Sequence, residues 1–484
     1  MKKILVYGFL SFLMIFFVSC DSWLDLNPKS SITVSSMWKN SSDAKAALNG
    51  AFNRFRSAFQ TNYIVWGDYR TGFYGNGIDN GSVDRGNVWN NLLIPSTVGT
   101  NWAGLYTAIN DCNLILKHTP DIIFEKESDK DYILGSAYYL RAFMYYYIVR
   151  IWGDAPVLTE GFESDNQEGL FPTRDVASKI YEQIEKDLQN AYDLISSSGG
   201  GSSPYGISKA AVNMLQTDFY LWEAKVNKKE DALGKAENAI TYVLNSGLQL
   251  SDSYESVFRD DINKEIIFSI AFVEAENTSS FAGDFLLKVS NVPVEYQNNP
   301  VQIGSSAQWV SMTSEHKNFL WGVENDTRAS VNILDYTTPD DQYYSWINKY
   351  LGTWKEGTRI FDSDVRVYRF AEALLFKAEI EIAHNNNSEA LKYINQVAKR
   401  AYGKDNYYAG SYTRQEIENI LLDERLKELA SEGKSWFDLI RLGQVFNRVK
   451  SLHGRENELN ILLWPVNNAS INTNPAITQT PGYE

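Results

Sequence analysis

The sequence predicts a mostly α-helical fold in which paired helices, like those of tetratricopeptide repeats, form a scaffold with long irregular loops packed on it. Apolar residues recur at helical spacing through most of the chain. Two long stretches, 67–99 and 273–362, have no regular period. Residues 208–227 and 231–245 have the lengths of a helix-turn-helix pair, although the signature residues of that repeat are absent, so the analogy is geometric.

The N-terminus carries an export signal. An apolar run over residues 4–18 follows two lysines, which is typical of a signal peptide and too short for a comfortable membrane span. The run ends at a small residue and Cys20, which looks like a bacterial lipobox, although Phe17 stands where Leu is usual. We expect a signal peptide over 1–19 and a lipidated tether over 20–40. An ordinary cleaved signal with a chance cysteine is the alternative.

The first part of the folded body, residues 41–272, is predicted to be helical apart from the Gly- and Asn-rich loop at 67–99. Cys112 lies on the apolar stripe of its helix, so we interpret it as a core residue and not as a reactive thiol. Residues 265–272 form a short β-like run. The predicted helices are 43–59, 101–118, 133–153, 173–196, 208–227 and 231–245.

The second part, residues 273–484, begins with the long excursion at 273–362, which we interpret as functional loop mixed with short elements. Residues 462–484 are predicted to form a loop-like tail. Helical spacing lies between the excursion and the tail, and predicts helices over 364–385, 388–401, 413–433 and 436–450.

Composition excludes several kinds of function. The chain has 484 residues, with 45 Lys and Arg against 60 Asp and Glu, a net charge of −15. Nucleic-acid binding is not expected, because a phosphate backbone requires clustered Lys and Arg. Two Cys and four His leave little from which to build a zinc site. We therefore expect no metal and no cofactor.

Four segments carry a more specific pattern. They are the lipobox with the DSWLDLNP that follows it, VYRFAEALLFKAEIEI, LLDERLKELASEGKSWFDLIRLG, and the closing NPAITQTPGYE, in which Thr480 stands where Asn is usual. In order and spacing they resemble the SusD/RagB family of Bacteroidetes outer-membrane lipoproteins across essentially the whole chain. The second segment matches the family's helix pattern at Arg369, Glu372, Leu375, Ala378 and Glu379.

This resemblance implies a scaffold of tetratricopeptide-like helix pairs. It also implies a function: a lipid-anchored protein of the outer membrane and cell surface that captures oligosaccharide or polysaccharide and delivers it to a SusC-type TonB-dependent transporter. Two alternatives remain, the same scaffold binding peptide or another nutrient, and an enzyme acting on polysaccharide. We expect a binding protein and no catalytic residues.

The charged motifs have a structural interpretation. Glu424, Glu428 and Glu432 lie four residues apart, along one face of a predicted helix. Such carboxylates are compatible with general acid/base catalysis. We favour instead a charged network that locks helices together, with Asp438 and Arg441 closing the next turn. Arg425 is expected to be buried, because leucines flank it.

Binding residues are instead expected in the loops. Sugar rings present flat apolar faces that aromatic side chains cover, and polar rims that amides and charged groups bind. Trp89, which neighbours several asparagines in a Gly-rich loop, is the first choice, and Trp321 is the second. The candidate glycan-binding residues are Trp89, Trp321, Tyr74, Asp68, Arg85, Asn90, Tyr296 and Trp309.

Overall fold

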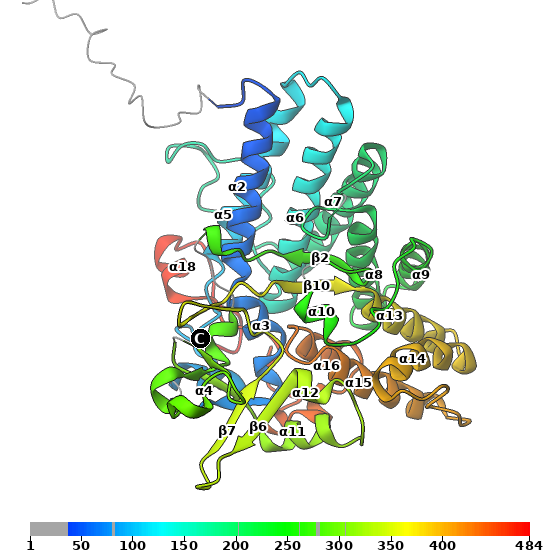
Figure 1. The fold of residues 1–484 in the computed structure, drawn as a ribbon. Coiled ribbons are helices and arrows are strands. Elements are labelled where there is room, and N and C mark those ends of the chain that lie inside the picture. Colours follow the sequence, from blue (N-terminus) through cyan, green and yellow to red (C-terminus); the bar gives the residue numbers. More distant parts are fainter. Residues whose placement is uncertain (1–36, 80–82, 202, 261, 277–280, 305) are drawn as a thin grey trace, which may run out of the picture.

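The computed structural model describes residues 37–79, 83–201, 203–260, 262–276, 281–304 and 306–484. Within these residues the fold is mostly α-helical, with small two-stranded sheets (Figure 1), which confirms the predicted fold class. The predicted signal peptide and Cys20 lie outside the described residues. None of the described helices is both long and apolar enough to span a membrane.

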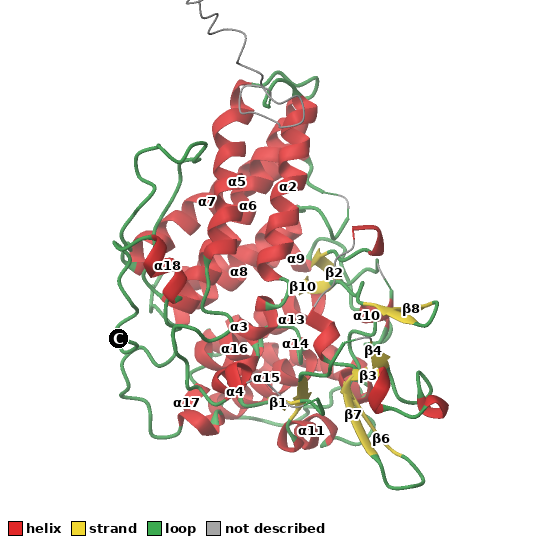
Figure 2. Cartoon of the chain, turned by 90° about the vertical axis from the view of Figure 1, so that its left-hand side faces the viewer, coloured by secondary structure: helices red, strands yellow, loops and turns green. Residues whose placement is uncertain are grey.

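Long helices pack side by side at one end of the molecule (Figures 1 and 2). The predicted all-round apolar helix is the centre of this group: from Ile133 to its end almost every side chain is buried. Cys112 lies in the core, as predicted. The group consists of α2 (Ser41–Phe59), α5 (Ala103–His118), α6 (Glu127–Trp152) and α7 (Ala177–Ser198).

A second set of helices continues the scaffold. The pair predicted from chain lengths is present as α8 (Lys209–Lys225) and α9 (Ala232–Leu244), which contact each other along their length. Two further helices, α13 (Phe370–Ala383) and α14 (Asn387–Tyr402), pair in the same way. The remaining helices of this part are α15 (Arg414–Glu428), α16 (Ser435–Arg441) and α17 (Val445–Arg448).

The helix predicted over 364–385 begins later than expected. Residues before Phe370 form strand β10 (Val365–Arg369), which pairs antiparallel with β2 (Ile266–Ile270). All five residues of β10 are buried. Two of the five, Arg366 and Arg369, are buried in ion pairs. The strand continues without a break into α13, so its apolar positions also fit a helix. Because β2 lies in the first part of the folded body, 41–272, and β10 in the second, 273–484, the pairing joins these two parts.

The stretch 67–99 is more regular than predicted. It contains β1 (Tyr74–Asn76) and α4 (Val83–Trp89), and α3 (Asn62–Gly67) leads into it. Strand β1 pairs antiparallel with β5 (Val310–Met312) of the excursion. Tertiary contacts therefore impose structure where local composition favours a loop.

The excursion consists of short elements, as predicted. Strands β6 and β7 form an antiparallel hairpin that projects from the lower end in Figure 1, and β8 with β9 forms another. Its α-helices and strands are β3 (Leu287–Lys288), β4 (Ile303–Gly304), β5, α11 (Ser314–Trp321), α12 (Ala329–Asn332), β6 (Ile333–Thr337), β7 (Tyr343–Ile347), β8 (Thr353–Lys355) and β9 (Thr358–Ile360).

Shorter segments complete the fold. Two short α-helices are α10 (Ser256–Arg259) and α18 (Asn468–Thr473), the latter inside the predicted tail. The 3-10 segments are η3 (Tyr69–Thr71), η4 (Thr119–Asp121), η5 (Glu274–Glu276), η6 (Phe281–Asp284), η7 (Val289–Asn291), η8 (Val294–Tyr296) and η9 (Lys450–Leu452).

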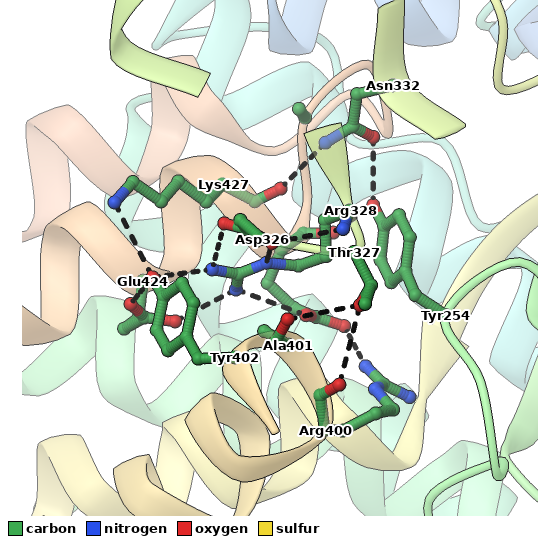
Figure 3. A network of polar contacts seen from close by, with 12 residues as sticks. Tyr254, Asp326, Thr327, Arg328, Asn332, Arg400, Ala401, Tyr402, Glu424 and Lys427 are labelled. Carbon is green, nitrogen blue, oxygen red and sulfur yellow. Dashed lines mark hydrogen bonds and ion pairs between the residues drawn. The ribbon is translucent and has the colours of Figure 1, made fainter. Parts of the chain in front are cut away.

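A buried network of charges ties the excursion to the scaffold (Figure 3). The guanidinium of Arg328 forks onto Asp326, with two hydrogen bonds of 2.9 Å, and also reaches Glu424 at 2.8 Å. Burial opposes ionisation of Glu428, but Arg400 and other guanidinium groups outweigh it and hold the pKa of this carboxyl well below its usual range. The structural interpretation of these carboxylates is therefore confirmed.

One detail of that prediction is wrong. Helix α15 ends at Glu428, so Glu432 lies beyond it, in the following turn. Arg425 is fully buried, as expected, but it pairs with Asp438 at 2.8 Å and with Glu372 at 3.1 Å across to neighbouring helices. Long-range partners of this kind are invisible in the spacing of one helix.

Both ends of the described chain are packed. The ring of Trp38 stacks on His118, with centroids 5.0 Å apart, and His118 Nε2 lies 2.7 Å from Glu163. At the other end Trp464 is buried, and its backbone N–H donates to the carbonyl of Ile151 at 2.7 Å. The predicted tail is therefore part of the folded body.

Candidate functional site

An aromatic pocket of about 430 Å³ opens at the end of the molecule opposite the long helices. It forms where residues around β1 and the end of α4 meet α11, α15 and the segment after α16. It is lined by Thr71, Gly72, Phe73, Tyr74, Gly75, Trp89, Asn90, Thr313, Glu315, His316, Phe319, Leu426, Arg448, Lys450 and Ser451.

The pairing of β1 with β5 positions the two main walls of the pocket. Tyr74 lies opposite Met312, and the backbone N–H of Thr313 donates to the carbonyl of Phe73 at 2.9 Å. Thr313 then caps α11, since its side chain accepts from the N–H of His316. The aromatic side chains before β1 and at the start of α11 are thereby held face to face.

Three rings form a stack where the segment before β1 meets α11. Phe73 and His316 lie almost parallel, with centroids 4.1 Å apart and an interplanar angle of 3°. Phe319 continues the stack, 5.9 Å from His316. Burial lowers the pKa of His316 to about 3, so its imidazole is neutral at physiological pH. Neither ring nitrogen has a hydrogen-bond partner among the described residues, and the stack acts as an apolar surface.

Two more rings, those of Trp89 and Tyr74, belong to the pocket lining. Trp89 ends α4 and is 8% exposed, so the expectation that it belongs to a loop without helical structure is wrong. Its ring lies 6.1 Å from that of Tyr69, edge to face. The Tyr74 hydroxyl lies 3.1 Å from Ser431 Oγ, and burial raises the pKa of Tyr74 well above its usual value.

Polar groups surround the opening. Asn90 is exposed and donates to the carbonyl of Gly86 at 2.8 Å, which leaves its side-chain oxygen without a partner among the described residues. Lys450 and Glu315 form an exposed ion pair of 2.6 Å, and Arg448 pairs with Asp423 at 2.9 Å. The pocket thus combines flat apolar faces with a polar rim.

Of the predicted site residues, the structure brings together Tyr74, Trp89 and Asn90 in this pocket. Asp68 lies beside it but is fully buried, and its carboxylate accepts hydrogen bonds from the backbone of Gly433 and Ser435. That position leaves Asp68 with no accessible surface for a ligand.

The other predicted residues lie outside the pocket. Arg85 pairs with Asp284 at 2.7 Å and lies over the ring of Trp309, 5.4 Å from its centroid. Tyr296 packs on Tyr336, with centroids 5.7 Å apart. Trp321, at the far end of α11, is 37% exposed and lies within 5.8 Å of the Lys317 ammonium.

Sequence reasoning missed Phe73, His316 and Phe319. Phe73 lies beside Tyr74, a predicted site residue in the 67–99 stretch, so its place in the sequence is a sign of its role. The two residues of α11 had none, because only the β1–β5 pairing brings 314–321 to this loop. Of the pocket-lining residues that the structure describes, Glu315 alone carries a carboxylate, and no described cluster could hold a metal ion.

Two family models match the chain. One, described as the SusD family, matches residues 308–483, and the other, described as starch-binding and associating with the outer membrane, matches 23–221. SusD-like protein P38 of Formosa agariphila is 26% identical over 499 residues, covering 96% of both chains.

Solved structures agree with this fold. A SusD superfamily protein from Bacteroides fragilis has a TM-score of 0.80 at 26% identity, covering 92% of this chain and 100% of its own. NanU of B. fragilis has the same TM-score at 25% identity, covering 95% of this chain and 100% of its own.

Proposed function

This chain belongs to the SusD/RagB family, and from that membership we propose that it binds glycan at a bacterial outer membrane. The description of one matching family model, as starch-binding and associating with the outer membrane, supports both parts of the proposal. The pocket between β1 and α11 is the site where the glycan binds.

The observation that carries this proposal is the ring stack of Phe73, His316 and Phe319, which lines the pocket together with Trp89. A sugar ring offers apolar C–H faces that pack on such surfaces, and its hydroxyls pair with polar groups at the edge. Asn90 supplies a free carbonyl oxygen at this edge. Phe73 and Phe319 are only half-buried, so both can cover more apolar surface.

The lining favours glycan over peptide. Five rings line the pocket, against three charged side chains, Glu315, Arg448 and Lys450. Two of these charges already pair with each other. A pocket for peptide termini or side chains would be expected to offer more unpaired charge.

Capture without cleavage is the proposed activity. Hydrolysis of a glycosidic bond generally uses two carboxyl groups on either side of it. Glu315 is the one carboxylate among the described lining residues, and Lys450 holds it at the rim. The other carboxylates considered as catalytic groups, Glu424 and Glu428, are fully buried in ion pairs.

Anchoring and delivery complete the proposal. Lipid on Cys20 keeps the protein at the outer membrane and cell surface, and a SusC-like TonB-dependent transporter receives the glycan. Stacking on a few rings, with ordering costs subtracted, corresponds to dissociation constants of about 1 μM to 1 mM. Such weak binding allows the glycan to be released to the transporter.

A glycan array followed by calorimetry tests the proposal. Protein lacking residues 1–20 is applied to defined oligosaccharides, and each oligosaccharide that binds is titrated into wild type and Phe73→Leu. We expect binding in the stated range, several-fold weaker for Phe73→Leu, with no shortened products after long incubation. Release of shorter sugars would identify an enzyme, and an affinity that Phe73→Leu leaves unchanged for every oligosaccharide that binds would exclude this pocket.

A further inference from the structure

A second groove, of about 640 Å³, lies on the helix scaffold, well away from the aromatic pocket. Its lining residues come from α7, α8 and α9, and α8 packs against both of the other helices. We call the α8 side of the groove its floor and the α7 and α9 sides its walls. The volume lies within the range of about 300–1,000 Å³ that is usual for ligand sites. Its elements share no lining residue with the pocket between β1 and α11.

The floor carries side-chain amides whose hydrogen bonds are incomplete. Gln216 is 8% exposed, and its amide has no hydrogen-bond partner among the described residues. Its polar atoms are not among those sealed from solvent, so they open onto the groove. Asn213, 2% exposed, uses its NH₂ on the carbonyl of Lys209 at 2.8 Å, which leaves its oxygen without a described partner.

These two amides lie in one row with the side chain of Tyr220. Asn213, Gln216 and Tyr220 are spaced by three and four residues, so they project from one face of α8. Nearly buried polar groups are normally paired, because an unpaired amide in a protein interior is costly. A row of incompletely paired amides on the floor of an open groove is therefore a built site for a polar ligand.

The charges of the groove are already compensated. Glu185 accepts from Lys235 at 2.7 Å, from Lys229 at 3.0 Å and from the Tyr220 hydroxyl at 3.3 Å. Glu182 and Lys186, which also line the groove, carry opposite charges, so the charges of the four ionised lining residues sum to zero, which favours an uncharged ligand. Protein partners usually insert apolar or aromatic anchors into well-packed pockets, but Ala239 is the one aliphatic residue among the described lining residues.

From this arrangement we propose that the groove between α7, α8 and α9 is a second saccharide site, for a neutral oligosaccharide. A hydroxyl both donates and accepts, and thus matches the two halves of the Gln216 amide and the free oxygen of Asn213. The half-buried ring of Tyr192, on the α7 wall, offers an apolar face for a sugar ring. Since the two sites share no residues, each proposal can fail independently.

An array of defined neutral oligosaccharides tests this site with folded protein that lacks only residues 1–20. The variants are Gln216→Leu in the groove, Phe73→Leu in the pocket, and Gln396→Leu as a matched control on α14, where the side chain is exposed and lines neither site. We expect at least one glycan whose binding falls about tenfold in Gln216→Leu but persists in Phe73→Leu and Gln396→Leu. An array pattern for Gln216→Leu identical to that of wild type would overturn the proposal.

Because Gln216 is nearly buried, its substitution can also disturb the fold. A variant at the exposed rim of the groove tests the site without that risk. Asn238→Ala removes an exposed amide of the α9 wall, and should weaken the same glycan by a smaller factor. Hydrogen exchange with that glycan present should protect α8. A second experiment tests for a peptide ligand by passing tryptic casein peptides over columns of immobilised wild type and Gln216→Leu. Retention of peptides by wild type but not by Gln216→Leu would assign the groove to peptide and overturn the saccharide assignment.

Discussion

The carboxylate of Asp68 accepts a hydrogen bond of 2.8 Å from the backbone N–H of Gly433, 365 residues further along the chain. Its second oxygen accepts from the N–H of Ser435 at 3.0 Å. A Cβ on Gly67 would lie 1.8 Å from the carbonyl oxygen of Gly433, so the two segments can approach this closely only with glycine at 67. One buried carboxylate therefore fixes the pocket segment to the turn between α15 and α16.

This carboxylate should make stability depend on pH. Burial raises the pKa of Asp68 from 3.8 to about 6, although the bonds from Gly433 and Ser435 oppose the shift. The folded state then binds a proton more tightly than the unfolded state, so the contribution of Asp68 to stability falls as pH rises from about 4 to 6. At 1.36 kcal/mol per pKa unit, the fall is on the order of 3 kcal/mol.

The measurement is the free energy of unfolding in urea at pH 4.5 and pH 7 for wild type and Asp68→Asn. The variant keeps the shape but cannot ionise, so its stability should fall less over this interval than that of wild type. Other carboxylates titrate equally in both proteins and cancel in the comparison. Equal pH dependence in the two proteins would show that Asp68 is not the titrating group.

Removal of Arg425 should damage folding. Arg425→Ala removes one of the two buried partners of Asp438 and of Glu372, which keep Arg441 and Lys434 respectively. Breaking a buried ion pair in this way typically costs about 3–5 kcal/mol. Arg414→Ala is the control on the same helix: Arg414 pairs with Glu418 at the surface, where the loss should be under about 1 kcal/mol. Denaturant unfolding compares the two. A similar loss in both variants would mean that burial of Arg425 contributes nothing.

Ligand affinity should depend more on Trp89 than on Trp321. Trp89 lines the pocket, whereas Trp321 ends α11 outside it. Loss of one stacking ring removes about 0.5–1.5 kcal/mol beyond burial, so Trp89→Ala should weaken binding of the oligosaccharide found on the array by about two- to tenfold. Calorimetry on both variants, with circular dichroism as a check of the fold, measures this. The reverse order would place the site at the C-terminal end of α11, around Trp321.

Lipidation should depend on Cys20. Because the apolar run ends in a motif that resembles a lipobox, we expect Cys20→Ala to remain an unprocessed precursor or to be released from membranes. Metabolic labelling with a fatty acid should mark wild type and leave the variant unlabelled. Cys112 is buried and remains in both proteins, so equal labelling of the two would point to another acylation site. Protease accessibility on intact cells tests surface exposure independently.

The sequence predicts the helices of the scaffold well, because their apolar stripes are local. It also indicates burial of Arg425, since leucines surround it in one helix. It fails where partners are distant: β10 pairs with β2, nearly a hundred residues earlier, and its apolar positions continue the helical pattern of α13. The partners of Arg425 lie on α13 and α16, which helical spacing within α15 cannot reveal.

The candidate site was predictable only in part. Trp89 and Asn90 stand out because aromatic and amide groups cluster in a Gly-rich stretch. His316 gives no such sign, and it reaches the pocket only because β1 pairs with β5. Asp68 shows the opposite error: a carboxylate in a loop looks available for a ligand, yet its hydrogen bonds hold two segments of the backbone together.

The stack of Trp38 on His118 limits the length of the segment that can connect the folded body to the membrane. If Cys20 is held in the lipid, as proposed, the chain has eighteen residue steps in which to reach the point where Trp38 joins the body. At about 3.5 Å per residue, even a fully extended chain spans no more than roughly 60 Å. An anchored protein therefore stays close to the membrane surface, and it can bind only polysaccharide that lies near the cell.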